Sequence, residues 1–135
     1  MKPQVSRVRA PSRGEVRRIL GDRALSTVFQ PIFGFREGRI IGFEALVRGP
    51  EGSMLHAPEA LFAAAQHAGV FAELGIVCVQ ETLRAFSRAG LDGGLFLNIS
   101  PQLIMQRGFD QDRAARFLEG LGLEPARVVI ELTED

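Results

Sequence analysis

The chain has 135 residues, of which 46% are hydrophobic and 24% charged, as in an ordinary globular domain with a core of its own. Sixteen basic and sixteen acidic side chains cancel, so the net charge gives no general attraction to a nucleic acid polymer or to a membrane surface. No apolar run approaches the ~20 residues of a membrane span. Cys78 is the only cysteine. It excludes an internal disulfide and suits a reducing cytoplasm.

The N-terminal third predicts a tail, a helix and a hairpin. Residues 1–13 mix Pro, Ser and Arg without a periodic apolar face, which is typical of a tail or linker. Ser12 is a candidate N-cap for the helix that follows. Turn residues between two β-rich runs then predict an antiparallel hairpin, in which Pro31 favours an edge strand. The helix is expected over 13–25, and the two strands over 27–33 and 39–47.

The remaining chain, up to residue 135, alternates helices with strands. Helices are predicted at 58–68, 71–88 and 110–120, and strands at 95–99 and 128–133. Strands separated by helices pair in parallel, so the fold class is α/β. The last predicted strand has no covering element after it, which gives the expectation that 14–135 is an interrupted domain.

Polar residues stand inside three of the predicted strands. They are Glu44, Asn98 and Glu131, each at or near the C-terminal end of its strand. Ligands bind at that end of the strands in parallel α/β folds, and the oxygens of Glu and Asn suit Mg²⁺ or Mn²⁺. Carboxylates among apolar neighbours are expected to need a compensating cation, metal or donor. The alternative is that these are ordinary edge positions or members of internal ion pairs, of Glu44 with Arg48 and of Glu131 with Arg127 or Arg107.

The two histidines are further apart than metal ligands usually are. His56 and His67 have no cysteine or second histidine near them in the sequence. The sequence therefore predicts ordinary surface or helix-face residues at both positions.

Four motifs in order resemble the EAL domain family of bacterial cyclic-di-GMP phosphodiesterases. They are Phe29-Gln30-Pro31-Ile32, the signature strand that contains Glu44-Ala45-Leu46, Asn98-Ile99-Ser100, and Glu131-Leu132-Thr133-Glu134. The resemblance covers roughly residues 15–135. It implies a TIM-like (β/α) barrel with an antiparallel first strand, of which about half is present, since a complete barrel takes ~250 residues.

The resemblance also implies roles for individual residues. Metal ligands would be Glu44, Asn98 and Glu131, with both glutamates counted as catalytic, in a site that holds two Mg²⁺ or Mn²⁺ ions. Substrate contacts would come from Gln30, Leu46 and Arg48, with Arg48 facing a phosphate. Glu134 would steady a later loop. The expected reaction is hydrolysis of cyclic-di-GMP to the linear dinucleotide.

The family's remaining catalytic groups are absent from this sequence. The resemblance implies an Asp-Asp pair, a lysine and a further glutamate on later strands, whereas Lys2 is the only lysine here. The 135-residue chain is therefore expected to be inactive by itself. A non-catalytic EAL module that binds cyclic-di-GMP or a protein partner is the alternative, and self-association through the open sheet is a further possibility.

Overall fold

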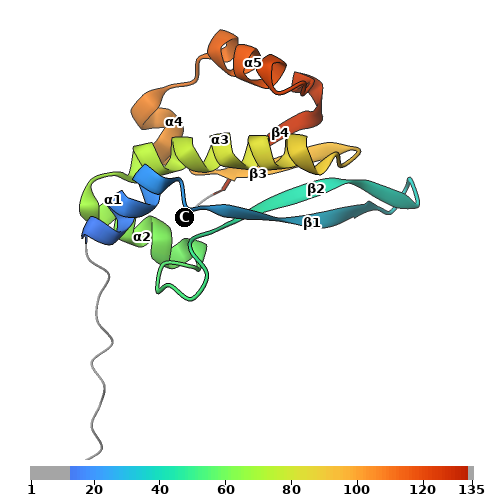
Figure 1. The fold of residues 1–135 in the computed structure, drawn as a ribbon. Helices are drawn as coiled ribbons and strands as arrows, with labels where there is room; N and C mark the ends of the chain where they lie inside the picture. The colour runs from blue at the N-terminus through green and yellow to red at the C-terminus, as the bar shows by residue number, and fades with distance from the viewer. Residues whose placement is uncertain (1–12, 134–135) are drawn as a thin grey trace, which may run out of the picture.

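The computed structural model describes residues 13–133, which form one four-stranded sheet with helices packed against it (Figure 1). Its elements in chain order are α1 (Arg13–Asp22), β1 (Ser26–Gly34), β2 (Arg39–Arg48), α2 (Pro58–Ala68), α3 (Phe71–Ala89), β3 (Gly94–Ile99), α4 (Pro101–Arg107), α5 (Gln111–Gly120), the 3-10 turn η1 (Pro125–Arg127) and β4 (Val128–Leu132).

The strands lie in the sheet in the same order as in the chain, β1-β2-β3-β4. β1 and β2 form the predicted antiparallel hairpin, and β3 and β4 then add in parallel. Pro31 lies in β1, at the edge of this sheet, as the missing amide donor of proline requires. This arrangement is part of a TIM-like barrel with an antiparallel first strand, which confirms the predicted fold class.

Helix signals in the sequence explain most boundaries. Proline occupies the first turn of α2, and Gly69 ends this helix in the left-handed conformation with φ 72°. The prediction for 58–68 is confirmed to the residue. α1 ends at Asp22, short of the predicted Leu25, because Arg23 takes a positive φ of 49° and turns the chain. The predicted cap Ser12 and most of the predicted tail lie outside the described residues.

One helix was not predicted. α4 follows β3 directly, and Ser100 caps it by accepting a hydrogen bond from the amide of Gln102 at 3.2 Å. Seven residues of helix are too few for a periodic apolar face to stand out in the sequence.

Two clusters of buried side chains hold the helices in place. The first packs β3 residues such as Leu95, which is fully buried, against Leu83 and Phe86 of α3. Burial of a leucine of this kind stabilises the fold by about 1.5–3 kcal/mol. The second joins α1, α2 and α3 around Val16, Leu61 and Leu74, with no exposed surface on any of the three.

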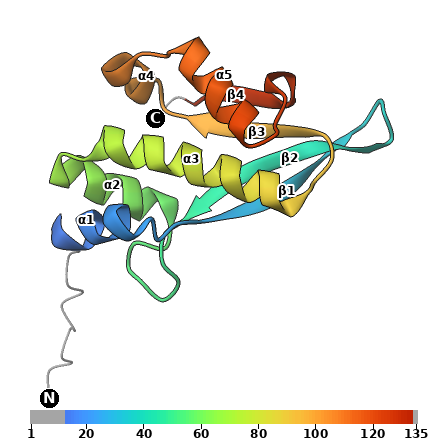
Figure 2. The ribbon, with the colours of Figure 1, turned by 45° about the horizontal axis from the view of Figure 1, so that its top comes forward.

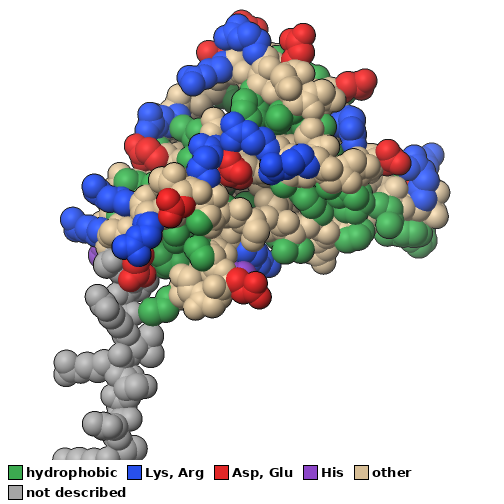
Figure 3. Space-filling model, in the orientation of Figure 1, with side chains coloured by type: hydrophobic (Ala, Val, Ile, Leu, Met, Phe, Trp, Pro, Cys, Tyr) green, Lys and Arg blue, Asp and Glu red, His purple; other side chains and the backbone are tan. Residues whose placement is uncertain are grey.

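Within residues 13–133, no helix covers the other face of the sheet (Figure 2). Figures 1 and 2 show α3 lying along one face, while the β1–β2 hairpin extends beyond the other elements. Exposed apolar residues mark the uncovered surface, and Figure 3 shows hydrophobic side chains along this hairpin, with cationic groups at its tip. They include Val28, Phe33, Phe35 and Ile40, which are 48–99% exposed.

Among residues 13–133, no helix has both the length and the apolar character that a membrane crossing requires.

Candidate functional site

The predicted site residues of β1 and β2 share the open face. Side chains alternate along a strand, so Ala45 points toward α3 and enters the core, while Glu44 and Leu46 point away from it. Gln30 lies opposite Glu44 in the antiparallel register, which brings it to the same face. Alternation also assigns Arg48, the last residue of β2, to that face.

A hydrogen bond joins two of the three predicted metal ligands. Asn98 Nδ2 donates to Glu44 Oε1 at 2.6 Å. Glu44 lies level with Phe96 in the β2–β3 register, so Asn98 is its diagonal neighbour, two residues closer to the strand end. Since Asn98 in turn lies level with Glu131 in the β3–β4 register, the three residues form one continuous row across adjacent strands.

These polar groups are less buried than the sequence suggests. Asn98 and Glu131 are exposed, and Glu44 is half-buried. The exposed carboxylate of Glu131 needs no compensation for burial, contrary to expectation, whereas the half-buried Glu44 has a donor of the expected kind in Asn98. Their apolar neighbours in the sequence, Leu97 for example, point to the opposite face and pack against the helices. The site is therefore an open, solvated surface.

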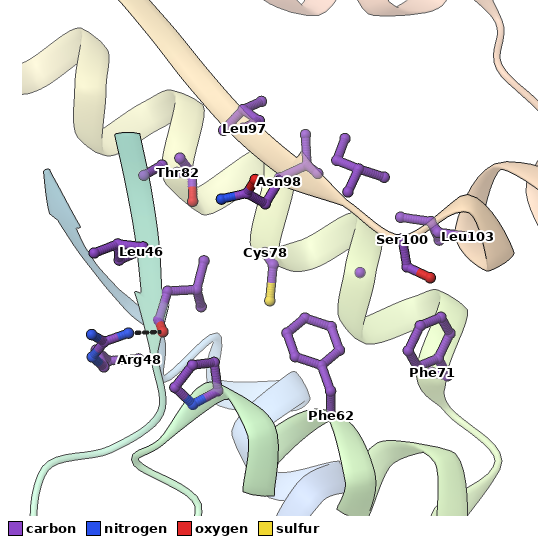
Figure 4. Close-up of a pocket in the computed structure, with 16 residues that line it drawn as sticks. Leu46, Arg48, Phe62, Phe71, Cys78, Thr82, Leu97, Asn98, Ser100 and Leu103 are labelled. Atoms are coloured by element: carbon purple, nitrogen blue, oxygen red, sulfur yellow. Dashed lines mark hydrogen bonds between the residues drawn. The ribbon is translucent and has the colours of Figure 1, made fainter. Parts of the chain in front are cut away.

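The alternative ion pairs do not form among residues 13–133. Arg107 pairs with Glu73 at 2.7 Å. Arg127 donates to the carbonyl oxygens of Gly93 and Leu91 and lies over the Phe86 ring, 5.3 Å from its centre. The guanidinium of Arg48 donates to the carbonyl of Val47 at 3.0 Å (Figure 4). Glu44 and Glu131 thus keep carboxylate oxygens free of cationic partners in the described part of the chain.

A small cavity of about 210 Å³ lies at the ends of β2 and β3, between the sheet and helices α2, α3 and α4. Its walls are mainly apolar, and Figure 4 shows Cys78, Phe62 and Phe71 around it, with Arg48 and Asn98 on the strand side. Binding sites for drug-sized ligands usually enclose about 300–1,000 Å³. The cavity is therefore smaller than this range.

Metal binding by these residues is chemically consistent with the donors present. No group of three or more His, Cys, Asp or Glu side chains suited to a metal occurs among residues 13–133. The row instead offers two carboxylates and one amide. Asn98 directs its Nδ2 to Glu44, so its Oδ1 is left as a potential ligand. An all-oxygen set of this kind fits Mg²⁺ or Mn²⁺ better than zinc.

One predicted site residue cannot be placed. Glu134 lies outside the described residues, so its expected role in steadying a loop stays a prediction. Ser100, in contrast, has a structural role that the motif alone did not predict. It caps α4 immediately after Asn98-Ile99, which fixes where β3 ends and the helix begins.

Comparison with solved structures identifies the same fold in other proteins. The chain is 26% identical to the PaMucR phosphodiesterase in its c-di-GMP complex, with a TM-score of 0.73 over 90% of this chain and 51% of that one. The FimX EAL domain from Pseudomonas aeruginosa, bound to c-di-GMP, gives 19% identity and a TM-score of 0.72, over 90% of this chain and 50% of that one.

A third relative was solved with a metal. Klebsiella pneumoniae BlrP1, in a manganese and c-di-GMP complex, is 24% identical with a TM-score of 0.68, over 82% of this chain and 28% of that one. The chain thus spans about half the length of the MucR and FimX chains and under a third of the BlrP1 chain.

A search of curated protein sequences finds no match to the chain. The family model of the EAL domain, however, matches residues 13–135. The match takes in all four motifs and nearly the whole chain, and it agrees with the structural likeness. The chain belongs to the EAL domain family.

Proposed function

We propose that this chain forms the metal-binding and substrate-binding part of an EAL-type phosphodiesterase that hydrolyses cyclic-di-GMP to the linear dinucleotide. The observation that carries the proposal is the row of Glu44, Asn98 and Glu131 across adjacent strands, in which Asn98 donates a 2.6 Å hydrogen bond to Glu44 and lies level with Glu131. Three oxygen-bearing side chains meet at the edge where parallel α/β folds bind their ligands.

The proposed metal is Mg²⁺ or Mn²⁺, held by Glu44, Asn98 and Glu131. A bound metal of this kind activates water and neutralises charge on a phosphodiester. The half-buried Glu44 carboxylate is fixed by its bond to Asn98, so its second oxygen points in a restricted direction. BlrP1 was solved with c-di-GMP and manganese, and also with calcium, which supports the choice of a divalent cation.

Substrate contacts are proposed for Gln30, Leu46 and Arg48. Gln30 and Leu46 lie beside Glu44 on the open face, where a flat ligand can reach all three. Arg48 offers a planar set of N–H donors that matches a phosphate. Because its only hydrogen bond among the described residues is to the backbone carbonyl of Val47, most of these donors remain available.

Catalysis is proposed to need residues beyond this sequence. The chain spans about half the length of its MucR and FimX relatives, and the further acids and the lysine that the family resemblance implies have no counterpart here. We therefore expect residues 13–135 to bind ligands without turning them over. The free, buried thiol of Cys78 supports a reducing cytoplasm as the location.

The test is hydrolysis of cyclic-di-GMP by this chain extended past Asp135 over the remainder of an EAL domain. We expect turnover with Mn²⁺, none with EDTA, and a loss of at least a hundredfold in Glu44→Ala. The matched control is Glu119→Ala, an exposed carboxylate on α5, which leaves the rate unchanged. Tight binding without turnover in the extended chain would instead identify a non-catalytic sensor module.

A further inference from the structure

The loop that follows Arg48 is closed by a pair of hydrogen bonds between Gly49 and His56. The amide of Gly49 donates to the carbonyl of His56 at 2.9 Å. In the opposite direction, Nδ1 of the His56 ring lies 3.0 Å from the carbonyl oxygen of Gly49. A carbonyl oxygen only accepts, so Nδ1 carries the proton. His56 is half-buried against this loop, which differs from the surface or helix-face residue that its sequence context predicts.

Other contacts leave this loop little freedom. Leu55 is fully buried in the cluster with Val16 and Leu61. Its amide donates to Ser53 Oγ at 3.0 Å. Any side chain at position 49 would collide with the carbonyl oxygen of Leu55, so the two ends of the loop meet in direct backbone contact.

Arg48 directly precedes the closed loop, and contacts on both sides hold its backbone. Its guanidinium is tied to the carbonyl of Val47 and, among residues 13–133, to no acidic side chain. The backbone on either side of Arg48 therefore decides where its donors point. The β2 ladder fixes that backbone on one side, through the pairing of Arg48 with Ser26. On the other side the fixed point is Gly49, which His56 holds at both of its polar backbone groups.

We propose that His56 is a positioning residue, which aims Arg48 at a phosphate of the bound dinucleotide by holding the Gly49 carbonyl. This inference rests on the proposed function, in which Arg48 contacts that phosphate. Phosphate recognition by a planar guanidinium is geometrically demanding, so a loosened backbone beside it weakens binding even when the fold is intact.

Three single variants of the 135-residue chain separate positioning from stability. His56→Ala removes the ring, His56→Asn retains a side-chain N–H near the position of Nδ1, and Ser53→Ala removes a hydrogen bond elsewhere in the same loop. The dissociation constant of cyclic-di-GMP is measured for each by calorimetry, below the unfolding transition. We expect about five- to tenfold weaker binding for His56→Ala, as for one lost hydrogen bond, and less than twofold change for the other two.

A double variant shows whether the effect passes through Arg48. In the Arg48→Ala background, His56→Ala should weaken binding no further, because the group that it positions is gone. If His56→Ala weakened binding by the same factor in the parent chain and in the Arg48→Ala background, the proposal would be overturned. So would His56→Asn binding as weakly as His56→Ala.

A ligand-free measurement keeps the test independent of the proposed function. NMR relaxation of the Arg48 side-chain Nε–Hε group and hydrogen exchange of the Gly49 amide report the order of both groups directly. We expect both to become more mobile in His56→Ala and to recover in His56→Asn. If the parent chain fails to bind cyclic-di-GMP, the assigned ligand is wrong. If the Arg48 side chain is equally ordered in all variants, His56 does not position it.

Discussion

Asn98 lies between the two carboxylates of the candidate site, and the two ends of its amide have different uses. Its Nδ2 donates to Glu44, and its Oδ1 has no hydrogen-bond partner among residues 13–133. An aspartate at this position would lose the donor and set a third negative charge beside Glu44 and Glu131. The amide therefore orients one ligand while remaining a neutral ligand itself.

Cys78 provides a second test at the residue scale, because burial raises the pKa of its thiol to about 12 from an ordinary value of 9.0. The unfolded chain loses this proton above pH 9, whereas the folded chain keeps it. Stability is therefore intact below pH 9 and falls as the pH rises from 9 toward 12, with a slope that approaches about 1.4 kcal/mol per pH unit. Chemical denaturation at a series of pH values measures this decline.

The chain is well suited to that measurement because few other groups titrate in the same range. It has no tyrosine, and Lys2 is its only lysine. In Cys78→Ala, the free energy of unfolding should be lower overall but nearly flat between pH 9 and 11. A decline of the same steepness in this variant would show that another group is responsible.

At the scale of elements, β2 and β3 approach each other closely at Gly42. A Cβ at this position would lie 2.5 Å from the carbonyl oxygen of Gly94 and 2.9 Å from the Phe96 ring. Gly42→Ala therefore forces apart the two strands that bring Glu44 and Asn98 together. We expect it to lower the free energy of unfolding by about 1–3 kcal/mol, as measured by urea denaturation.

Gly21 is the matched control for that substitution. It lies in α1 without a positive φ, and a methyl group at this position would have no neighbouring atom within 4 Å. Gly21→Ala should stabilise the chain by about 0.5–1 kcal/mol, because alanine favours the helix. If both alanine variants changed stability in the same direction, close packing at Gly42 would not be the cause.

Local signals in the sequence predicted the elements well where residues typical of helix starts and ends are present. α2 has proline at its start and glycine at its end, and its bounds agree with the prediction. Prediction failed where tertiary contacts or short length decide the outcome. The positive φ of Arg23 has no clear local signature, and α4, although Ser100-Pro101 begins it and Gly108 follows it, is too short for a periodic apolar face.

The site shows the same division between local and long-range information. Alternation along β2 predicts one face for Glu44, Leu46 and Arg48, and the burial of Ala45 in the core agrees with it for Glu44 and Leu46. The bond from Asn98 to Glu44, however, depends on β2 and β3 being neighbours in a particular register, over a separation of 54 residues. The exposure of Glu131 depends on which face the helices cover, which the sequence pattern of one strand does not reveal.

At the scale of the whole molecule, the uncovered sheet is the dominant feature. No strand pairs with the outer edge of β4 among residues 13–133, and Leu132 on that strand is 59% exposed. Unpaired edges and exposed apolar faces favour association between copies. We therefore expect the 135-residue chain to associate as its concentration rises, which sedimentation velocity measures.

A charge on the β4 edge should reduce this association. Leu132→Arg is expected to shift the chain toward the monomer, since the charge must be desolvated in any strand-to-strand contact. Met105→Arg is the control, because Met105 is 86% exposed but lies on α4. Equal effects of the two substitutions would argue against the sheet edge as the contact.

In the proposed function, Glu44, Asn98 and Glu131 act together as one metal site, and Mn²⁺ binding to the 135-residue chain tests this most directly. We expect saturable binding of Mn²⁺ by electron paramagnetic resonance, weakened at least tenfold by Glu44→Ala and by Glu131→Ala, and unchanged by Glu119→Ala. Binding that is equally strong in all of these variants would contradict the assignment.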